Sequence, residues 1–131
     1  MILGVGIDLI DTDRVARVSD KYGERFISRI LSDEERTIFN KLEIKNKKNN
    51  FLAKKFSAKE SFLKALGIGL GRGIELSDIT IINNIYGKPE IKLNKKAKNI
   101  VENLYKGDKI SFNISITDEK NLVNTITIIS N

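Results

Sequence analysis

Two acidic and two basic side chains occupy positions at which the surrounding sequence predicts an apolar core. Asp8 interrupts an otherwise apolar opening strand, and Glu60 follows Lys59 and precedes Lys64 in a helical segment. Burial of a charge is unfavourable unless a partner charge or a metal ion compensates it. Magnesium is usually held by one or two carboxylates together with substrate phosphates. These residues therefore predict a site for Mg²⁺ and a phosphorylated ligand, in which Asp8 and Glu60 bind the metal.

Each of the helical residues also has a purely structural interpretation. Glu60 and Lys64 are four residues apart, and such pairs on helix surfaces contribute only about 0.2–0.5 kcal/mol. Lys59 falls on the apolar side of the helix, where its methylene stem could pack while its ammonium group reaches water. Alternatively, that side borders a cleft that holds a phosphate or a carboxylate. Its apolar residues are Leu52, Phe56, Leu63 and Leu66.

The opening strand has two chemically different faces. Alternation over residues 2–10 places Gly4, Gly6 and Asp8 on one face and Leu3, Val5, Ile7 and Leu9 on the other. A glycine within a strand leaves room for a ligand or another backbone to come close, and it can also mark a bulge. The pattern is compatible both with a ligand beside Asp8 and with close packing.

The composition excludes several kinds of chemistry. The 131 residues include neither cysteine nor histidine, which rules out disulfides, cysteine nucleophiles and the commonest zinc ligand. Acid–base chemistry must then use carboxylates, lysines or metal-bound water. The net charge of +6 favours a polyanionic or acidic partner. The length fits a single domain, residues 1–131, and is short for an enzyme that encloses a large cofactor alone, so we expect an oligomer.

Capping and periodicity assign the elements of the first half of the chain. Asp11–Asp13 supplies N-cap candidates for one helix, and Ser32–Glu35 has the spacing of a capping box that opens a second. Residues 45–50, rich in lysine and asparagine, are expected to form a solvated loop. A main helix follows over residues 50–66, with Gly67 as its C-terminal cap.

The second half of the chain is richer in strands. The expected elements are strands at 78–83, 90–93, 110–117 and 122–129 and a helix at 95–104. Mixed helices and hairpins predict an α+β fold. No apolar segment is long enough to span a bilayer, and the opening residues lack the pattern of a signal peptide, so we expect a cytoplasmic protein without a membrane partner.

A basic face recurs along the first helix. Arg14, Arg17 and Lys21 are spaced by three and four residues, and Arg25 and Arg29 extend this face past Gly23. A run of charges is usually a solvated surface. With the positive net charge, the alternative is a docking surface for an acidic protein, on which such charges steer association and fix register.

The glycine-rich segment Gly67–Gly73 follows a helix and does not lie between a strand and a helix. It therefore matches neither the dinucleotide-binding fingerprint nor the P-loop. It either ends the helix and forms a loop, or it lets the backbone at Gly67 and Gly69 approach a nucleotide.

Three segments, in this order, resemble one known family. Gly4–Leu9, Phe51–Gly67 with its Lys-Glu-x-x-x-Lys pattern, and Tyr86–Pro89 are similar to holo-acyl-carrier-protein synthase, the short class of 4′-phosphopantetheinyl transferases. The resemblance implies an antiparallel sheet packed against a long central helix. It also implies Mg²⁺-dependent transfer of 4′-phosphopantetheine from coenzyme A to a serine of apo-acyl carrier protein, in support of fatty acid biosynthesis. Homotrimers with active sites between subunits are a further implication.

The resemblance also assigns roles to individual residues. Asp8 and Glu60 match the magnesium-binding carboxylates, and Lys64 matches the lysine near the phosphates. Lys55 and Lys59 match basic positions around coenzyme A. The surface that meets the carrier protein corresponds to Arg14 with its helical neighbours, which we extend to Arg17, Lys21 and Arg25.

The chemistry expected from these roles is displacement at a diphosphate. The enzyme must align the serine hydroxyl and neutralise charge that builds on the phosphate oxygens. Lys64 would stabilise the leaving bisphosphate, and either Glu60 or a metal-bound water would take the serine proton. Because the chain has no histidine, we favour the water, with Glu60 orienting it.

The chain departs from the family pattern in two places. The family usually has a Ser-His pair where this chain has Ile114–Asp118, and whether Asp118 compensates is open, because an acid beside phosphates would repel them. The alanines that often flank Lys-Glu are Ser57 and Ser61 here, which keeps the site roomy.

Two other functions compete with this interpretation. One is a small basic RNA-binding module that uses Lys41–Lys59. It explains the charge but not the acids among apolar residues, and the chain lacks an evident aromatic platform. We therefore expect no nucleic acid partner. The other is an enzyme acting on a different nucleotide diphosphate with the same metal site.

Overall fold

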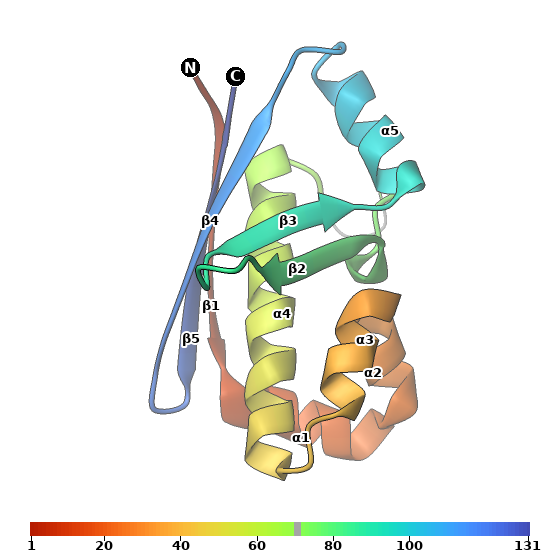
Figure 1. Ribbon diagram of the computed structural model, residues 1–131, viewed down its shortest axis with the longest axis vertical. Helices are drawn as coiled ribbons and strands as arrows, with labels where there is room; N and C mark the ends of the chain where they lie inside the picture. Colours follow the sequence, from red (N-terminus) through yellow and green to blue (C-terminus); the bar gives the residue numbers. More distant parts are fainter. Residues whose placement is uncertain (70–71) are drawn as a thin grey trace.

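The protein has an α+β fold in which two antiparallel sheets pack around one long helix (Figure 1). The computed structural model describes residues 1–69 and 72–131. In chain order the elements are β1 (Ile2–Asp11), α1 (Thr12–Tyr22), α2 (Glu24–Ile30), α3 (Asp33–Asn40), α4 (Lys45–Leu66), the short 3-10 helix η1 (Leu76–Asp78), β2 (Ile79–Asn83), β3 (Pro89–Leu93), α5 (Lys95–Leu104), β4 (Ser111–Glu119) and β5 (Leu122–Ser130). The expected fold class, with a sheet against a long central helix, is confirmed.

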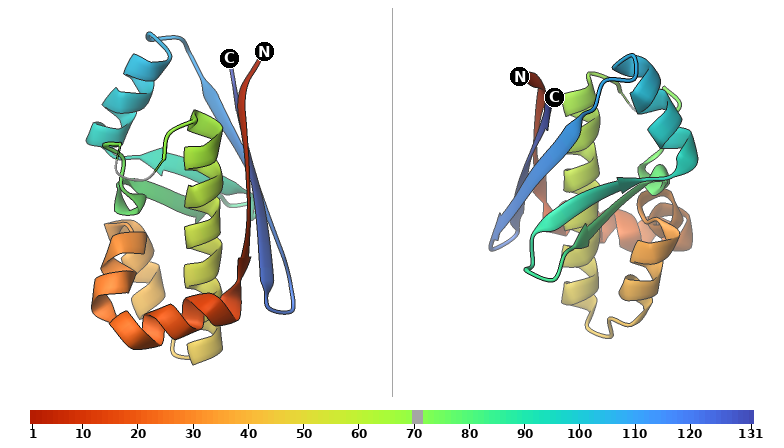
Figure 2. Two further views of the ribbon diagram at one scale, coloured as in Figure 1. Left: turned by 180° about the vertical axis from the view of Figure 1, so that it is seen from behind. Right: turned by 45° about the horizontal axis from the view of Figure 1, so that its top comes forward.

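The larger sheet has the strand order β1-β5-β4, and β2 pairs with β3 in the smaller one. α4 lies on one face of the larger sheet (Figure 2). The smaller sheet crosses α4, α1 runs from β1 past the lower end of α4, and α2 and α3 lie on the side of α4 away from the larger sheet. Asp8 is directly opposite Thr125 on β5, and Gly6 is opposite Thr127. The stretch of β1 around Gly6 and Asp8 packs against α4 near Ser61 and Lys64.

The two glycines of β1 permit close packing against α4. A Cβ atom at Gly4 would lie 2.0 Å from the Ala65 carbonyl oxygen, and one at Gly6 would lie 1.9 Å from the Ser61 carbonyl oxygen. Real Cβ atoms do not come this close to backbone. Of the two interpretations of these glycines, the structure shows helix packing, and the helix occupies the space beside the strand.

α4 is longer than expected, because the predicted loop at 45–50 is its first turns. That prediction was wrong. Lysine is a good helix former, but a polar stretch carries no apolar periodicity that would reveal a helix. Tertiary contacts stabilise this end: Lys45 pairs with Asp20 at 3.0 Å, and the Lys48 ammonium lies over the Phe39 ring at 5.3 Å from its centroid.

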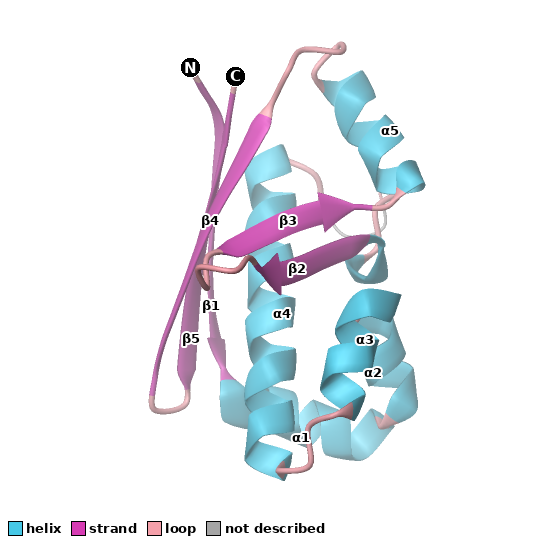
Figure 3. Ribbon diagram, viewed as in Figure 1, coloured by secondary structure: helices cyan, strands magenta, loops and turns pink. Residues whose placement is uncertain are grey.

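Several helix boundaries follow the capping residues that the sequence indicated. The Asp11 side chain accepts from Asp13 N, and Ser32 and Glu35 form the expected capping box. α4 ends at Gly67, whose φ of 71° is left-handed and therefore favours glycine. The closing hairpin β4–β5 and helix α5 are also present, as Figure 3 shows. Within the described residues, none of the helices has the length and apolar character to cross a bilayer.

Candidate active site

The structure brings Asp8, Glu60 and Lys64 together where β1 crosses α4. The Lys64 ammonium donates to Asp8 Oδ1 at 3.0 Å and to the Ile7 carbonyl oxygen at 3.0 Å. The Asp8 side chain is 13% exposed and that of Lys64 is 52% exposed. Lys64 therefore bridges helix and strand by pairing with Asp8, and it is more than the second member of a surface pair with Glu60.

Two carboxylate oxygens of this cluster are buried without a hydrogen-bond partner in the described chain. They are Asp8 Oδ2 and Glu60 Oε1. Buried polar atoms normally have a partner, and an exception needs an explanation such as an ion. A divalent cation with oxygen ligands would satisfy both atoms. The described ranges contain no group of three or more His, Cys, Asp or Glu side chains that could hold a metal ion.

The electrostatics of the cluster also suit a cation. Burial raises the pKa of Glu60 above its ordinary value, and the Asp8 charge raises this pKa further. Lys64 acts in the opposite direction. A carboxylate beside a second negative charge binds a cation well, because the cation relieves the repulsion between the two charges.

Pairs of buried hydroxyl groups hold this part of α4 on the sheet. Ser57 Oγ lies 3.0 Å from Thr125 Oγ1, and Ser61 Oγ lies 2.7 Å from Thr127 Oγ1. The sequence suggested only that the two serines leave room. The two serines instead fill the contact between α4 and the sheet, next to Glu60. The sequence could not identify their threonine partners, because these depend on how β5 lies against α4.

Comparisons with known proteins decide the family. The model of the 4′-phosphopantetheinyl transferase superfamily matches residues 4–119. The chain belongs to this superfamily. A holo-[acyl-carrier-protein] synthase of Orientia tsutsugamushi (strain Ikeda) is 40% identical over 130 residues, which cover 99% of this chain and 98% of the relative.

Solved structures agree with this membership of the superfamily. The Neisseria meningitidis holo-[acyl-carrier-protein] synthase superposes with a TM-score of 0.89 at 31% identity and covers all of both chains. A Bacillus anthracis synthase, solved in complex with CoA (3′,5′-ADP), has a TM-score of 0.78 at 29% identity and covers 98% of this chain and 96% of its own. The resemblance seen in the sequence and the prediction of a transferase are confirmed, and we do not carry the RNA-binding alternative forward.

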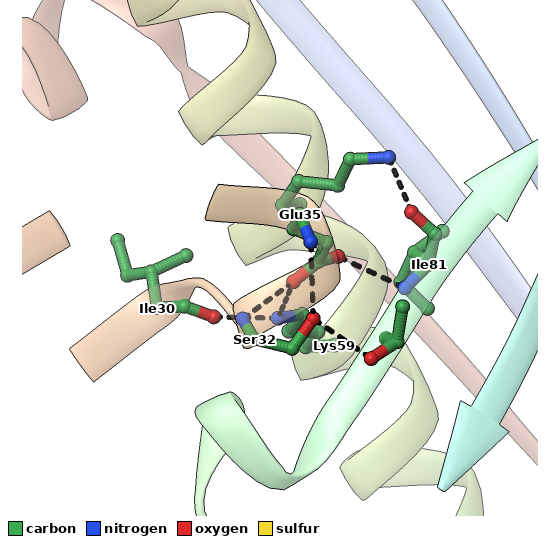
Figure 4. A network of polar contacts seen from close by, with 7 residues as sticks. Ile30, Ser32, Glu35, Lys59 and Ile81 are labelled. Atoms are coloured by element: carbon green, nitrogen blue, oxygen red, sulfur yellow. Dashed lines mark hydrogen bonds and ion pairs between the residues drawn. The ribbon is translucent and has the colours of Figure 1, made fainter. Parts of the chain in front are cut away.

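Lys59 lies in the interior of this fold. Its side chain and that of Glu35 are fully buried, and the two pair at 2.5 Å (Figure 4). Neither interpretation from the sequence, a lysine reaching water or a lysine beside a ligand cleft, describes this position. The partner was missed because Glu35 has an evident role as a capping residue and lies 24 positions earlier in the chain.

Lys55 lies at a cavity on another side of α4. Its ammonium donates to the Ile81 carbonyl oxygen and sits over the Phe51 ring at 4.9 Å from the centroid. A cavity of about 380 Å³ extends from there to the β2–β3 turn. We call it the basic cavity. Its lining includes Lys47, Lys54, Lys55, Asn83, Gly87 and Pro89.

Asp118 pairs with a lysine of this cavity. Its Oδ1 lies 3.1 Å from Lys54 Nζ, and the two side chains are 40% and 35% exposed. The charge of Asp118 is thus partly neutralised. The sequence could not reveal this contact, because the two residues are 64 positions apart and on different elements.

The predicted carrier-protein residues Arg14, Arg17, Lys21 and Arg25 are exposed on α1 and α2. Arg14 also lines a small cavity of about 180 Å³ with Asp8, Val18, Phe26 and Phe56. The basic face and the carboxylate cluster therefore adjoin. Gly67 and Gly69 lie exposed at the end of α4, while Leu70 and Gly71 of the glycine-rich segment lie outside the described residues.

Proposed function

We propose that this protein transfers 4′-phosphopantetheine from coenzyme A to a serine of an apo-acyl carrier protein. The observation that carries the proposal is the pair of buried, unpartnered oxygens of Asp8 and Glu60 beside the Lys64 ammonium. This arrangement suits a diphosphate with its cation. The complex of the Bacillus anthracis relative with CoA (3′,5′-ADP) supports coenzyme A as donor. A role in fatty acid biosynthesis in the cytoplasm follows from this reaction.

Mg²⁺ fits the site, and Asp8 and Glu60 would hold it. The fit rests on two hard oxygen donors that lack other partners. When bound, it would supply charge neutralisation on the diphosphate oxygens of coenzyme A.

The proposed reaction exchanges one bond to phosphorus for another, and side chains of the protein stabilise the charges and orient the water that takes the proton. The serine oxygen forms a bond to the phosphorus of phosphopantetheine, and the bond from this phosphorus to adenosine 3′,5′-bisphosphate breaks. Lys64 stabilises charge on the leaving phosphate. Glu60 orients a water that accepts the serine proton.

The basic cavity is the proposed site for the nucleotide end of coenzyme A, with Lys55 and Lys54 as phosphate contacts. Lys55 lies about 140° around the helix from Glu60. One subunit therefore presents the cavity and the carboxylates on different sides of α4. Active sites shared between subunits of a homotrimer would bring the cavity of one copy to the carboxylates of the next. Gly67 and Gly69 remain proposed backbone contacts to the cofactor, and Lys59 is left out.

The outer face of the larger sheet supports this assembly and provides a test. Val5, Ile7, Leu9 and Ile126 are 55%, 57%, 62% and 37% exposed there, and a cluster of exposed apolar side chains marks an interaction site. We expect Ile7→Asp to dissociate the trimer and abolish transfer, because a carboxylate is costly to bury in an apolar interface. Analytical ultracentrifugation of Ile7→Asp and of Asn103→Asp, which adds the same charge at an exposed position of α5, gives the comparison. An unchanged mass for Ile7→Asp would contradict the trimer.

The acceptor is proposed to dock on the basic face. Arg14, Arg17, Lys21 and Arg25 would meet an acidic carrier protein, and the position of Arg14 beside Asp8 would bring the acceptor serine to the carboxylates.

Intact-mass analysis of an apo-acyl carrier protein tests the reaction directly. Incubation with this protein, coenzyme A and Mg²⁺ should add one phosphopantetheine, and a chelator should abolish the addition. Unmodified carrier protein under all conditions would overturn the proposal.

The raised pKa of Glu60 predicts how metal binding varies with pH. Protons compete with the cation at higher pH than at an ordinary glutamate, so the rise in melting temperature caused by Mg²⁺ should shrink as pH falls from 8 towards 5. In the chelated protein, the contribution of Glu60 to the melting temperature instead grows as pH falls. The folded state binds the Glu60 proton more tightly than the unfolded state, so this contribution is lost as pH rises through the folded pKa. Thermal melts with Mg²⁺ and with chelator across this range measure both trends, and a pH-independent effect of Mg²⁺ would contradict the assignment.

The Lys54–Asp118 pair predicts an effect on coenzyme A binding. A phosphate that binds Lys54 must compete with Asp118, so Asp118→Asn should lower KM for coenzyme A by about twofold to fivefold, the range expected for a partly exposed pair. Steady-state kinetics at low salt, with the neighbouring exposed Glu119→Gln as control, measure this. A higher KM would show that Asp118 orients the lysine instead of masking it.

A further inference from the structure

The most deeply buried ion pair of the molecule has no role in the chemistry described so far. Among the ion pairs of the described residues, Lys59 with Glu35 is the only one with both side chains fully buried. Desolvation lowers the pKa of Lys59 to about 8, while Glu35 opposes this shift. A buried pair is a weak source of stability, because desolvation offsets its attraction. The pair therefore contributes little net stability.

The pair joins four elements at one point (Figure 4). From α4, the Lys59 ammonium donates to Glu35 Oε1 on α3 and to the Ile30 carbonyl oxygen at the end of α2, both at 2.5 Å. Glu35 Oε1 also accepts from Ser32 N at 2.9 Å, and Glu35 Oε2 accepts from Ile81 N on β2 at 2.9 Å. Each oxygen of the carboxylate thus has a defined backbone partner, which leaves little freedom for the lysine.

This contact constrains the residue that follows it in the sequence. Successive helical residues are about 100° apart, so the direction of Lys59 determines the direction of Glu60. With Lys59 held toward α3 and β2, Glu60 faces β1 and the Asp8 charge that raises its pKa. The apolar neighbours of Lys59 could pack in slightly rotated positions, whereas hydrogen bonds tolerate little change in distance and angle.

The same pair also holds the wall of the basic cavity. Ile81, whose N–H donates to Glu35, accepts from Lys55 through its carbonyl oxygen. Asn83, two residues further along β2, lines the cavity. A shift of β2 away from α4 would therefore change the cavity and the carboxylate cluster together.

We infer that the Lys59–Glu35 pair is a positioning element of the active site, which sets the rotation of α4 so that Glu60 points at Asp8 and holds β2 at the cofactor cavity. Lys59 and Glu35 act through Glu60 and β2 and touch no substrate. The inference rests on the proposed function only for its kinetic consequence.

The test removes the charges while keeping the fold. Lys59→Met alone would leave the Glu35 carboxylate buried without a partner and can prevent folding. Lys59→Met/Glu35→Gln keeps similar volumes and an acceptor for a backbone N–H. A matched control is Lys96→Met/Asp78→Asn, which alters the ion pair of 2.9 Å between α5 and η1. If the double variant does not fold, as judged by circular dichroism, the same measurements on Glu35→Gln decide.

Two measurements separate positioning from stability alone. Because the chain has no cysteine, Asp8→Cys/Glu60→Cys can be introduced into each background, and the rate of disulfide formation reports the approach of positions 8 and 60 without metal or turnover. We expect slower cross-linking in the Lys59→Met/Glu35→Gln background than in wild type or the control. For transfer activity, Lys59→Met/Glu35→Gln is measured without the two cysteine substitutions. We expect its kcat to fall about tenfold or more, as when a partner of a metal ligand is removed, and its KM for the carrier protein to stay unchanged.

Each outcome distinguishes the two proposals. Cross-linking and kcat equal to wild type in a folded Lys59→Met/Glu35→Gln variant would overturn the positioning role and leave the pair as a structural contact. Slower cross-linking, with no transferase activity in the wild type either, would support the positioning role and overturn the proposed function.

Discussion

Asp8→Asn and Glu60→Gln should each lower kcat/KM for phosphopantetheine transfer by more than about 100-fold. Substitution of a residue that only supports a metal ligand already costs about 10–100-fold in metal affinity or activity, and these two side chains are the proposed ligands themselves. A neutral amide keeps the size of each side chain but removes the charge that attracts the cation. The measurement is steady-state transfer to an apo-acyl carrier protein at rising Mg²⁺ concentrations.

The stability of Glu60→Gln distinguishes this loss of activity from misfolding. Glu60 is partly buried, and its pKa is raised by desolvation and by Asp8, so the charged carboxylate disfavours the metal-free fold. In the presence of a chelator, Glu60→Gln should therefore melt at the same temperature as wild type or above it. Glu102→Gln, on the exposed surface of α5, is the control that should keep full activity. Near-wild-type transfer by both Asp8→Asn and Glu60→Gln at saturating Mg²⁺ would show that the assigned roles are wrong.

Local patterns predicted most of the elements and the residues of the carboxylate cluster. Strand alternation identified the face of β1 that contains Asp8, and the spacing within α4 placed Glu60 and Lys64 on one side. The approach of Asp8 to Glu60 and Lys64 depends on the tertiary structure. It depends on β1 crossing α4 at the position of Gly6, which brings Lys64 within hydrogen-bond distance of Asp8.

The contacts that sequence reasoning missed around the candidate site involve partners far apart in the chain. Lys59 looked out of place in an apolar stripe, and it is balanced by Glu35, a residue whose local pattern indicates only a helix cap. Asp118 looked unfavourable beside phosphates, and it is paired with Lys54. A charge in an apolar pattern signals a compensating partner but carries no information about which residue that is.

The glycines of β1 lead to the prediction with the largest expected effect on stability. In Gly6→Ala, the new Cβ would lie 1.9 Å from the Ser61 carbonyl oxygen and 2.5 Å from Ala65 N. Both are backbone atoms of α4, which cannot rotate away as a side chain can. Overpacking of a tight contact typically costs about 1–3 kcal/mol, and we expect about 3 kcal/mol or more here, because helix and strand must move apart.

Separation of α4 from β1 would also damage the active site. Lys64 would lose its contacts with Asp8 and Ile7, and Glu60 would move away from Asp8. Gly6→Ala should thus lose most transferase activity even at temperatures at which it stays folded. The free energy of unfolding from urea titration and the transfer rate at 15 °C measure the two effects. Gly69→Ala is the matched control for stability, since a Cβ atom there would meet nothing in the described part of the chain within 4 Å, apart from its own chain neighbours. Equal unfolding free energies for Gly6→Ala and wild type would mean that β1 and α4 are not in the close contact on which the geometry of the carboxylate cluster depends.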